Sequence, residues 1–180
     1  TDSEDGLGFS YYVAIAGASE AWQGATVELS YDAGANYTDS RDATVSIIMG
    51  QLTTALEDHP QEFPDTVNTC RVSIQTDGGE LEETDLAGLL SGDNLAIIGD
   101  EIVQFAGADE VEEGIWELSY FLRGRKDTAT ASHAIGSRFV MLDELTAIPA
   151  AVTDLGRTLT FRATTFGAAA ETGTVVSMVY

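Results

Sequence analysis

Basic residues are scarce in this chain, and their densest group is the first candidate for chemistry. The protein has 8 basic residues against 30 acidic ones. Three of them, Arg123, Arg125 and Lys126, surround Gly124. Guanidinium groups bind carboxylates through paired hydrogen bonds, so this cluster is a candidate interface that docks an acidic surface of a neighbouring chain. Pairing within the chain, at the end of a strand, is an equally weighted alternative.

The many acidic residues do not by themselves indicate an enzyme. Pairs such as Asp109 and Glu110 are sequence neighbours, whereas glycoside hydrolysis needs two carboxyl groups held across a cleft. The chain shows no nucleophile elbow and no glycine-rich phosphate loop. We therefore expect no catalytic residues, no cofactor and a non-enzymatic role.

The sequence also offers weak signals for a metal site. Asp32, Gly34 and Asn36 have the spacing of a calcium loop, but the central glycine and the twelfth-position glutamate of an EF-hand are missing. A hairpin turn is the favoured interpretation, with a weakly bound cation as the alternative. His59 and His133 are too few for a metal site unless acids complete it, so we expect no metal.

Three further side chains have types that can bind or react. Cys70 shares an apolar strand face with Val72, which favours a buried thiol over a nucleophile. Trp116 alternates with Leu118, which favours core packing. Trp22 lies in a less regular stretch, and it is the candidate surface contact, with sugar stacking as one use.

These residues must be positioned mainly by β-strands. Residues 115–123 alternate, with Trp116, Leu118, Tyr120 and Leu122 on one face and Phe121 and Arg123 on the other. A Gly99-Asp100 turn joins two apolar runs into a predicted hairpin. Thr84 and Gly92 bound one predicted helical turn, 51–59 is a helix or a strand, and 145–155 is an irregular crossover. Further strands are predicted at 9–17, 24–31, 44–49, 67–76, 138–142, 157–165 and 174–180.

About ten short strands with regular turn signals predict an all-β fold, a sandwich or a barrel. Residues 1–8 form an acidic lead-in, 9–59 a first β-rich part, 60–66 a proline-containing loop and 67–180 a second β-rich part. The two parts are either one continuous domain or two small β-domains.

The charge restricts the class of partner. A formal net charge of −22 opposes binding to nucleic acid and to anionic membrane surfaces. No apolar run reaches the ~20 residues that span a bilayer, so we expect no membrane insertion.

A resemblance to a known family rests on three segments. The runs LAIIG-DEIVQF, W-ELS-FLRGRKDT and HAIGSRFVMLD, all between residues 94 and 143, are similar to the C-terminal region of the large tail-tip proteins of tailed bacteriophages and gene transfer agents. The similarity covers roughly Phe9 to Asp143. One departure is Asp127, which stands before Thr128 where the family has glycine.

The resemblance implies a structural module at the tail tip of a virion, in the baseplate, with a part in host specificity. By the same resemblance the partners are other tail-tip or baseplate proteins, the chain is a homotrimer in the particle, and it contacts the host envelope. The alternative function is a carbohydrate-binding β-module that recognises host surface glycans.

Overall fold

In the computed structural model, the described residues are 9–17, 19, 21–143 and 145–179. They form two compact units. Unit 1 is built from both ends of the chain, from the segment up to Gly17, from Ala21–Ser46 and from Leu145 onward. Unit 2 consists of Ile47–Glu144 with residues 18–20. Unit 2 is thus inserted in the sequence between the two parts of unit 1.

This division differs from the predicted domain boundary. The proline-containing segment 60–66 is a loop leading into a strand, but it lies inside unit 2. The chain leaves unit 1 near Ser46 and returns at Leu145. A loop rich in proline marks where a strand cannot continue, whether or not two domains meet there. The predicted lead-in, residues 1–8, lies outside the described residues.

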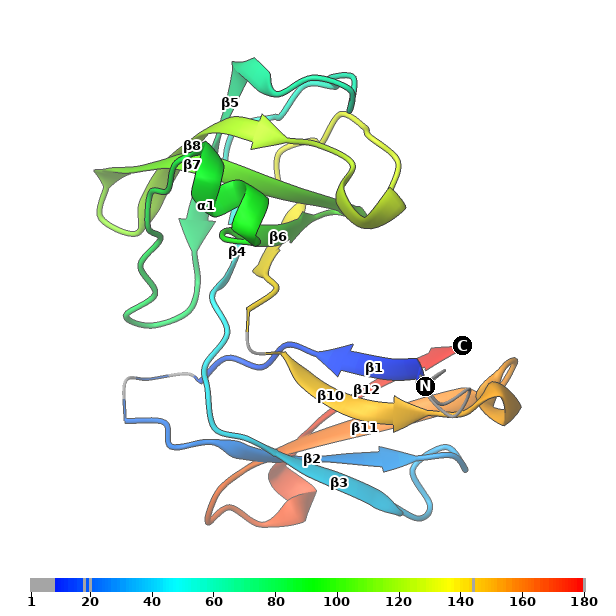
Figure 1. The fold of residues 1–180 in the computed structure, drawn as a ribbon. Helices are drawn as coiled ribbons and strands as arrows, with labels where there is room; N and C mark the ends of the chain where they lie inside the picture. Colours follow the sequence, from blue (N-terminus) through cyan, green and yellow to red (C-terminus); the bar gives the residue numbers. More distant parts are fainter. Residues whose placement is uncertain (1–8, 18, 20, 144, 180) are drawn as a thin grey trace. The chain divides into compact units, whose positions relative to one another are not determined.

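Unit 2 is a closed barrel of antiparallel strands (Figure 1). Strand β9 pairs back onto β4 and closes the barrel. Its interior holds one apolar cluster that includes Phe105, Phe121 and Phe139. Closure leaves no free edge between these strands. The strands in order around the barrel are β4 (Met49–Leu52), β5 (Asp65–Ile74), β8 (Ile115–Leu122), β7 (Glu101–Glu112), β6 (Leu95–Ile98) and β9 (Arg138–Met141).

Two predicted local features of the barrel are confirmed. Strands β6 and β7 form the expected hairpin, and Gly99 in its turn has a φ of 60°. The predicted helical turn is α1 (Leu86–Ser91), which Gly92 ends in the left-handed region. The helix is capped by the Asp85 carboxylate, which accepts a hydrogen bond from the Gly88 N–H, and not by Thr84 as predicted.

Unit 1 consists of two layers. One is the four-stranded sheet β12-β11-β2-β3, and the other is the pair β1-β10. Side chains of Val27, Leu29, Leu159 and Phe161 pack with Tyr11 and Ile148 from the pair. The strands are β1 (Phe9–Val13), β2 (Ala25–Ser30), β3 (Asp39–Ala43), β10 (Thr146–Ala150), β11 (Thr158–Thr165) and β12 (Thr174–Val179). Unit 1 also contains the short 3-10 turns η3 (Val152–Asp154) and η4 (Ala170–Thr172), whereas η2 (Arg125–Asp127) belongs to unit 2.

Two predicted segments take other forms. Residues 44–48 are not a strand, because they carry the chain from unit 1 into unit 2. Residues 146–150, predicted as an irregular crossover, form strand β10, which pairs with β1. Pro149 is tolerated because β10 has a hydrogen-bonded neighbour on one side only.

The all-β prediction is confirmed, with twelve strands among the described residues. Where the chain is described, it has no helix of the length and apolar character needed to cross a membrane.

Candidate interaction site: loops held by a buried ion-pair cluster

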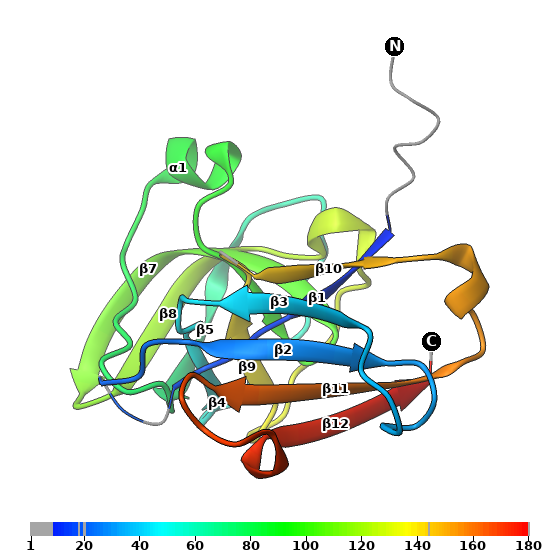
Figure 2. The same cartoon turned by 90° about the horizontal axis from the view of Figure 1, so that it is seen from below.

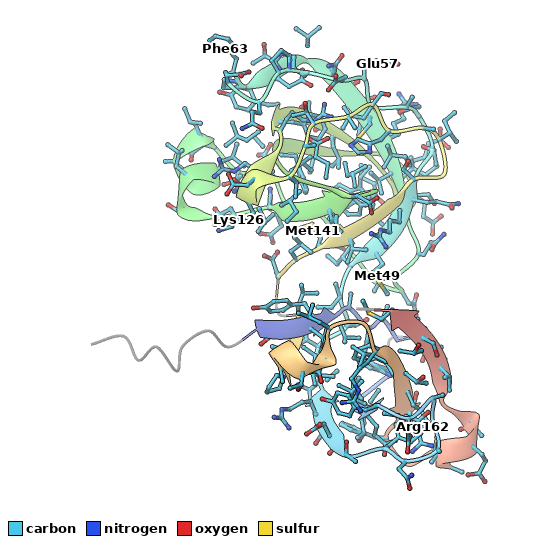
Figure 3. The ribbon with its side chains drawn as sticks, turned by 90° about the vertical axis from the view of Figure 1, so that its right-hand side faces the viewer. Met49, Glu57, Phe63, Lys126, Met141 and Arg162 are labelled. Carbon is cyan, nitrogen blue, oxygen red and sulfur yellow. The ribbon has the colours of Figure 1, made fainter. Side chains whose placement is uncertain are left out.

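Two loops of unit 2 are tied together at one end of the barrel. The first, residues 53–64, connects β4 to β5, and the second, residues 123–137, connects β8 to β9. Leu56 and His133 form a β-bridge between them, with N–H···O distances of 2.9 and 2.7 Å. Figure 3 shows Glu57 and Phe63 of the first loop at the opposite end of the barrel from Met49.

Arg123 lies under both loops with its side chain fully buried. Nε and Nη2 each donate to Glu101 at 2.8 Å, the paired geometry that carboxylates favour. Nη1 donates to Asp65 at 3.3 Å and to the Glu57 carbonyl at 2.8 Å. Nη2 also donates to the Ala131 carbonyl at 2.6 Å. All five N–H donors of the guanidinium are therefore used within the unit.

Glu101 is the acidic centre of this cluster and is 1% exposed. Besides Arg123, it accepts hydrogen bonds from the N–H groups of Gly124 and Ala131, at 2.9 and 3.2 Å. The His133 ring, with Nε2 at 2.8 Å, completes its contacts. Burial alone would raise the pKa of Glu101, but the hydrogen bonds from His133 and Arg123 outweigh it and lower that pKa to about 2.

Asp65, at the start of β5, is the second buried acid. One oxygen accepts from the N–H groups of Val67 and Asn68 at 3.2 and 3.0 Å, and the other accepts from the Asn68 amide at 2.9 Å. Burial opposes its ionisation, yet these bonds keep the pKa of Asp65 below its ordinary value. The His59 ring lies 4.0 Å from the same carboxylate.

Backbone geometry in β8 explains why Arg123 is buried. Tyr120 has a φ of 55°, in the left-handed region that a bulky residue seldom adopts. Trp116 and Leu118 face the barrel core as predicted, but beyond Tyr120 the alternation shifts by one residue and Phe121 joins the same core cluster. A shift of one residue moves every later side chain to the other face. Arg123 therefore follows Phe121 to the inside.

This cluster can hold backbone segments in place, because its charges are opposed, buried and saturated with hydrogen bonds. We call the five residues Asp65, Glu101, Arg123, His133 and Asn68 the Arg123 clamp. Removing water from such a cluster is costly unless every member is paired, and here each member is. The clamp joins the start of β5, the start of β7 and both loops.

The clamp supports an exposed apolar surface. Phe63 and Val67, two residues before and two after buried Asp65, are 68% and 80% exposed. The N–H of Val67 and the side-chain amide of Asn68 donate hydrogen bonds to Asp65, and these bonds restrain this part of the segment. Glu57, Asp58 and Glu62 in the same segment are exposed. We call residues 57–67 the Phe63 surface.

The structure separates the residues of the predicted basic interface. Arg123 is buried in the clamp, so the interface prediction does not hold for it, and the alternative of pairing within the chain does. Arg125 is half-buried and donates to Gln104 at 2.8 Å. Lys126 is exposed. Of the three, Lys126 is the most exposed residue.

Other predicted residues have clear places. Trp22 is half-buried and packs over Gly17, leaving no room there for a side chain. Cys70 is buried, and burial raises its thiol pKa to about 12, which suits the predicted core role. Trp116 is in the barrel core, as predicted.

The candidate calcium loop is a hairpin turn between β2 and β3. Asp32 is exposed, and it accepts hydrogen bonds from the N–H and the amide of Asn36 at 2.8 and 2.7 Å. These bonds lower its pKa to about 2. Among the described residues, no group of three or more His, Cys, Asp or Glu side chains is placed to hold a metal ion.

The sequence singled out Arg123 as a candidate residue, but it did not indicate its burial or its partners. Glu101, Asp65 and His133 come from three separate segments, and no spacing rule links them. A weak signal existed, because Glu101 begins an apolar strand and an acid there needs a partner.

A search of curated proteins finds no match to this chain. A family model, Rcc01698-like, C-terminal, matches residues 47–140. The family is named after a gene-transfer-agent-type protein of Rhodobacter. The matched range begins where unit 2 begins and ends within β9, the last strand of the barrel. The chain therefore belongs to the Rcc01698-like, C-terminal family.

Proposed function

We propose that this chain is a structural module of a phage or gene-transfer-agent tail tip, where it acts by assembling with other tail-tip or baseplate proteins. Two findings support the proposal. The family is named after a gene-transfer-agent-type protein, and its model spans the strands of the barrel. The structure adds a surface suited to assembly in the same barrel.

The observation that carries the proposal is the pairing of exposed apolar side chains with a rigid support. Phe63 and Val67, on either side of buried Asp65, are 68% and 80% exposed, and neighbouring exposed apolar groups are a feature of contact sites. The Arg123 clamp binds the segment that carries them at the Glu57 carbonyl and at the N–H of Val67, which lowers the conformational entropy lost when a partner binds. The acidic residues around them suit a partner with a basic rim.

The first experiment asks where the chain is located. Antibodies to the purified chain are applied to particles from the producing strain, and the label is observed by electron microscopy. Label confined to the tail tip is the expected result. Particles without label, with the antigen free in the medium, contradict the proposal and make glycan binding the next question for a glycan array.

A second experiment tests the Phe63 surface within that role. Phe63→Ala should lower the amount of this chain in purified particles at least fivefold while its thermal unfolding stays unchanged. Leu90→Ala is the matched control, because Leu90 lies in α1 of the same unit, outside both loops of the candidate site, and is 71% exposed. Equal incorporation of both variants would leave the tail-tip location standing and remove the Phe63 surface as its contact.

A further inference from the structure

Among the strands that the structure describes, β12 is at the edge of its sheet, and it lacks the features by which proteins protect such edges. In the order β12-β11-β2-β3 it has one hydrogen-bonded neighbour, and Figure 2 shows it along the outer side of this sheet. Its sequence, TVVSMV, holds no charged residue and no proline. Lysine, proline and bulges are the usual protection against edge-to-edge pairing.

The apolar face of the sheet continues onto β12 without a cover. Val176 lies opposite Phe161 and Met178 opposite Leu159, so the four side chains share one face. Leu159 and Phe161 are in the core of unit 1, whereas Val176 is 60% and Met178 44% exposed. On the other face Val175 is 54% exposed. A further strand beside β12 would cover side chains on both faces.

The distribution of charged residues indicates which strand can pair with β12. The chain carries a net charge of −22, which repels a second copy over most of its surface. Strands β11 and β12 contain no Asp or Glu, and Arg162 is their one charged residue. This edge is therefore a place where two copies can meet without opposing carboxylates on the pairing strands.

The register of β12 also suits a second copy. In an antiparallel pair centred on Val176, Val176 lies opposite its own symmetry mate and Met178 opposite Thr174. The residues of each pair then come from the same face of the two sheets, as strand pairing requires. We propose that β12 is a self-association edge, which pairs antiparallel with β12 of a second copy and joins two four-stranded sheets into one.

This inference does not rest on the tail-tip role, because it concerns the isolated chain. Sedimentation equilibrium of the purified protein should show concentration-dependent association, strengthened by added NaCl because salt screens the net charge. Val176→Lys should weaken this association at least tenfold, since it places two lysines opposite each other. Leu90→Lys is the control, because it changes the net charge equally at a 71% exposed residue of α1 in unit 2, outside both loops and outside the Phe63 surface.

Cross-linking tests the register. Val176→Cys should form a disulfide-linked dimer under mild oxidation, whereas Ser40→Cys, at the other edge of the same sheet in β3, should not. Buried Cys70 does not compete. The proposal is overturned by a chain that stays monomeric at millimolar concentration and high salt. It is equally overturned by association, of any stoichiometry, that Val176→Lys leaves unchanged or that cross-links through position 40.

Discussion

At the scale of single residues, the basic cluster around Gly124 contains side chains in opposite environments, which the local sequence does not distinguish. Arg123 is buried and bonds to Glu101 and Asp65, while Lys126, three positions later, is exposed. A guanidinium can satisfy five hydrogen bonds at once, which makes it suited to a buried junction of several segments.

Replacing Arg123 should destabilise unit 2. Arg123→Gln leaves two buried carboxylates without their cation, and breaking a buried ion pair in this way costs about 3–5 kcal/mol. The measurement is the free energy of unfolding in urea. Lys126→Gln is the control and should change that free energy by less than about 0.5 kcal/mol. Equal stability of the two variants would contradict the role of the clamp.

The clamp should also make stability depend on acid pH. The pKa of Glu101 is about 2 in the folded chain, against an ordinary value of 4.5. Because the folded pKa is the lower one, ionised Glu101 stabilises unit 2 fully above about pH 4.5, and this contribution is lost as pH falls towards 2. The lowered pKa of Asp65 acts in the same direction.

Fluorescence of Trp116, with Trp22 replaced by Phe, would report the unfolding of unit 2 across this pH range. Glu101→Gln should be less stable at neutral pH and should show a flatter decline between pH 4.5 and 2. An equally steep decline in the variant would show that other carboxylates cause it.

At the scale of elements, the barrel depends on close backbone contacts between strands as much as on its apolar cluster. Gly50 in β4 lies between β5 and β9, where an added Cβ would meet the backbone carbonyl of Ser73. Gly107 in β7 is equally crowded, but there the Cβ would meet the hydroxyl of Ser119. Backbone of a paired strand cannot move aside, whereas a hydroxyl can rotate.

Gly50→Ala should therefore destabilise the barrel by about 1–3 kcal/mol, the usual effect of overpacking. Gly107→Ala should have an effect of less than about 1 kcal/mol. Urea unfolding of both variants gives the comparison. A larger loss in Gly107→Ala than in Gly50→Ala would show that β4 is not held between its neighbours as described.

At the scale of the whole molecule, one unit is continuous in sequence and the other is not. Unit 2 contains all six strands of a closed barrel and its own core cluster within residues 47–144. Unit 1 pairs β2 with β11 and β1 with β10, so it needs both ends of the chain. The homotrimer implied by the family resemblance stays a prediction that the sedimentation measurement also tests.

A fragment of residues 47–144 should fold alone, with a single cooperative urea transition and dispersed amide NMR signals. A fragment of residues 1–46 should not fold, because its strands lack β10 and β11. If the first fragment shows no cooperative transition, unit 2 does not fold independently and the prediction is wrong.

Local patterns were sufficient to predict most strands. Alternation identified β8, the Gly99-Asp100 pair identified the β6–β7 hairpin, and Gly92 identified the end of α1, because each signal depends on neighbouring residues and their allowed backbone angles. The apolar environment of Cys70 and Trp116 was also predictable from their strands. The all-β class follows from these elements together.

Pairing between distant segments was decided by the tertiary structure. No local pattern states that β9 returns to β4 to close the barrel, or that β11 crosses back to β2 and leaves unit 2 as an insertion. The left-handed angle at Tyr120 reverses the alternation that placed Arg123 outside, and such an angle in a bulky residue is maintained by surrounding contacts. The sequence alone thus determined which segments are strands, while long-range packing decided which strands pair and which charges are buried.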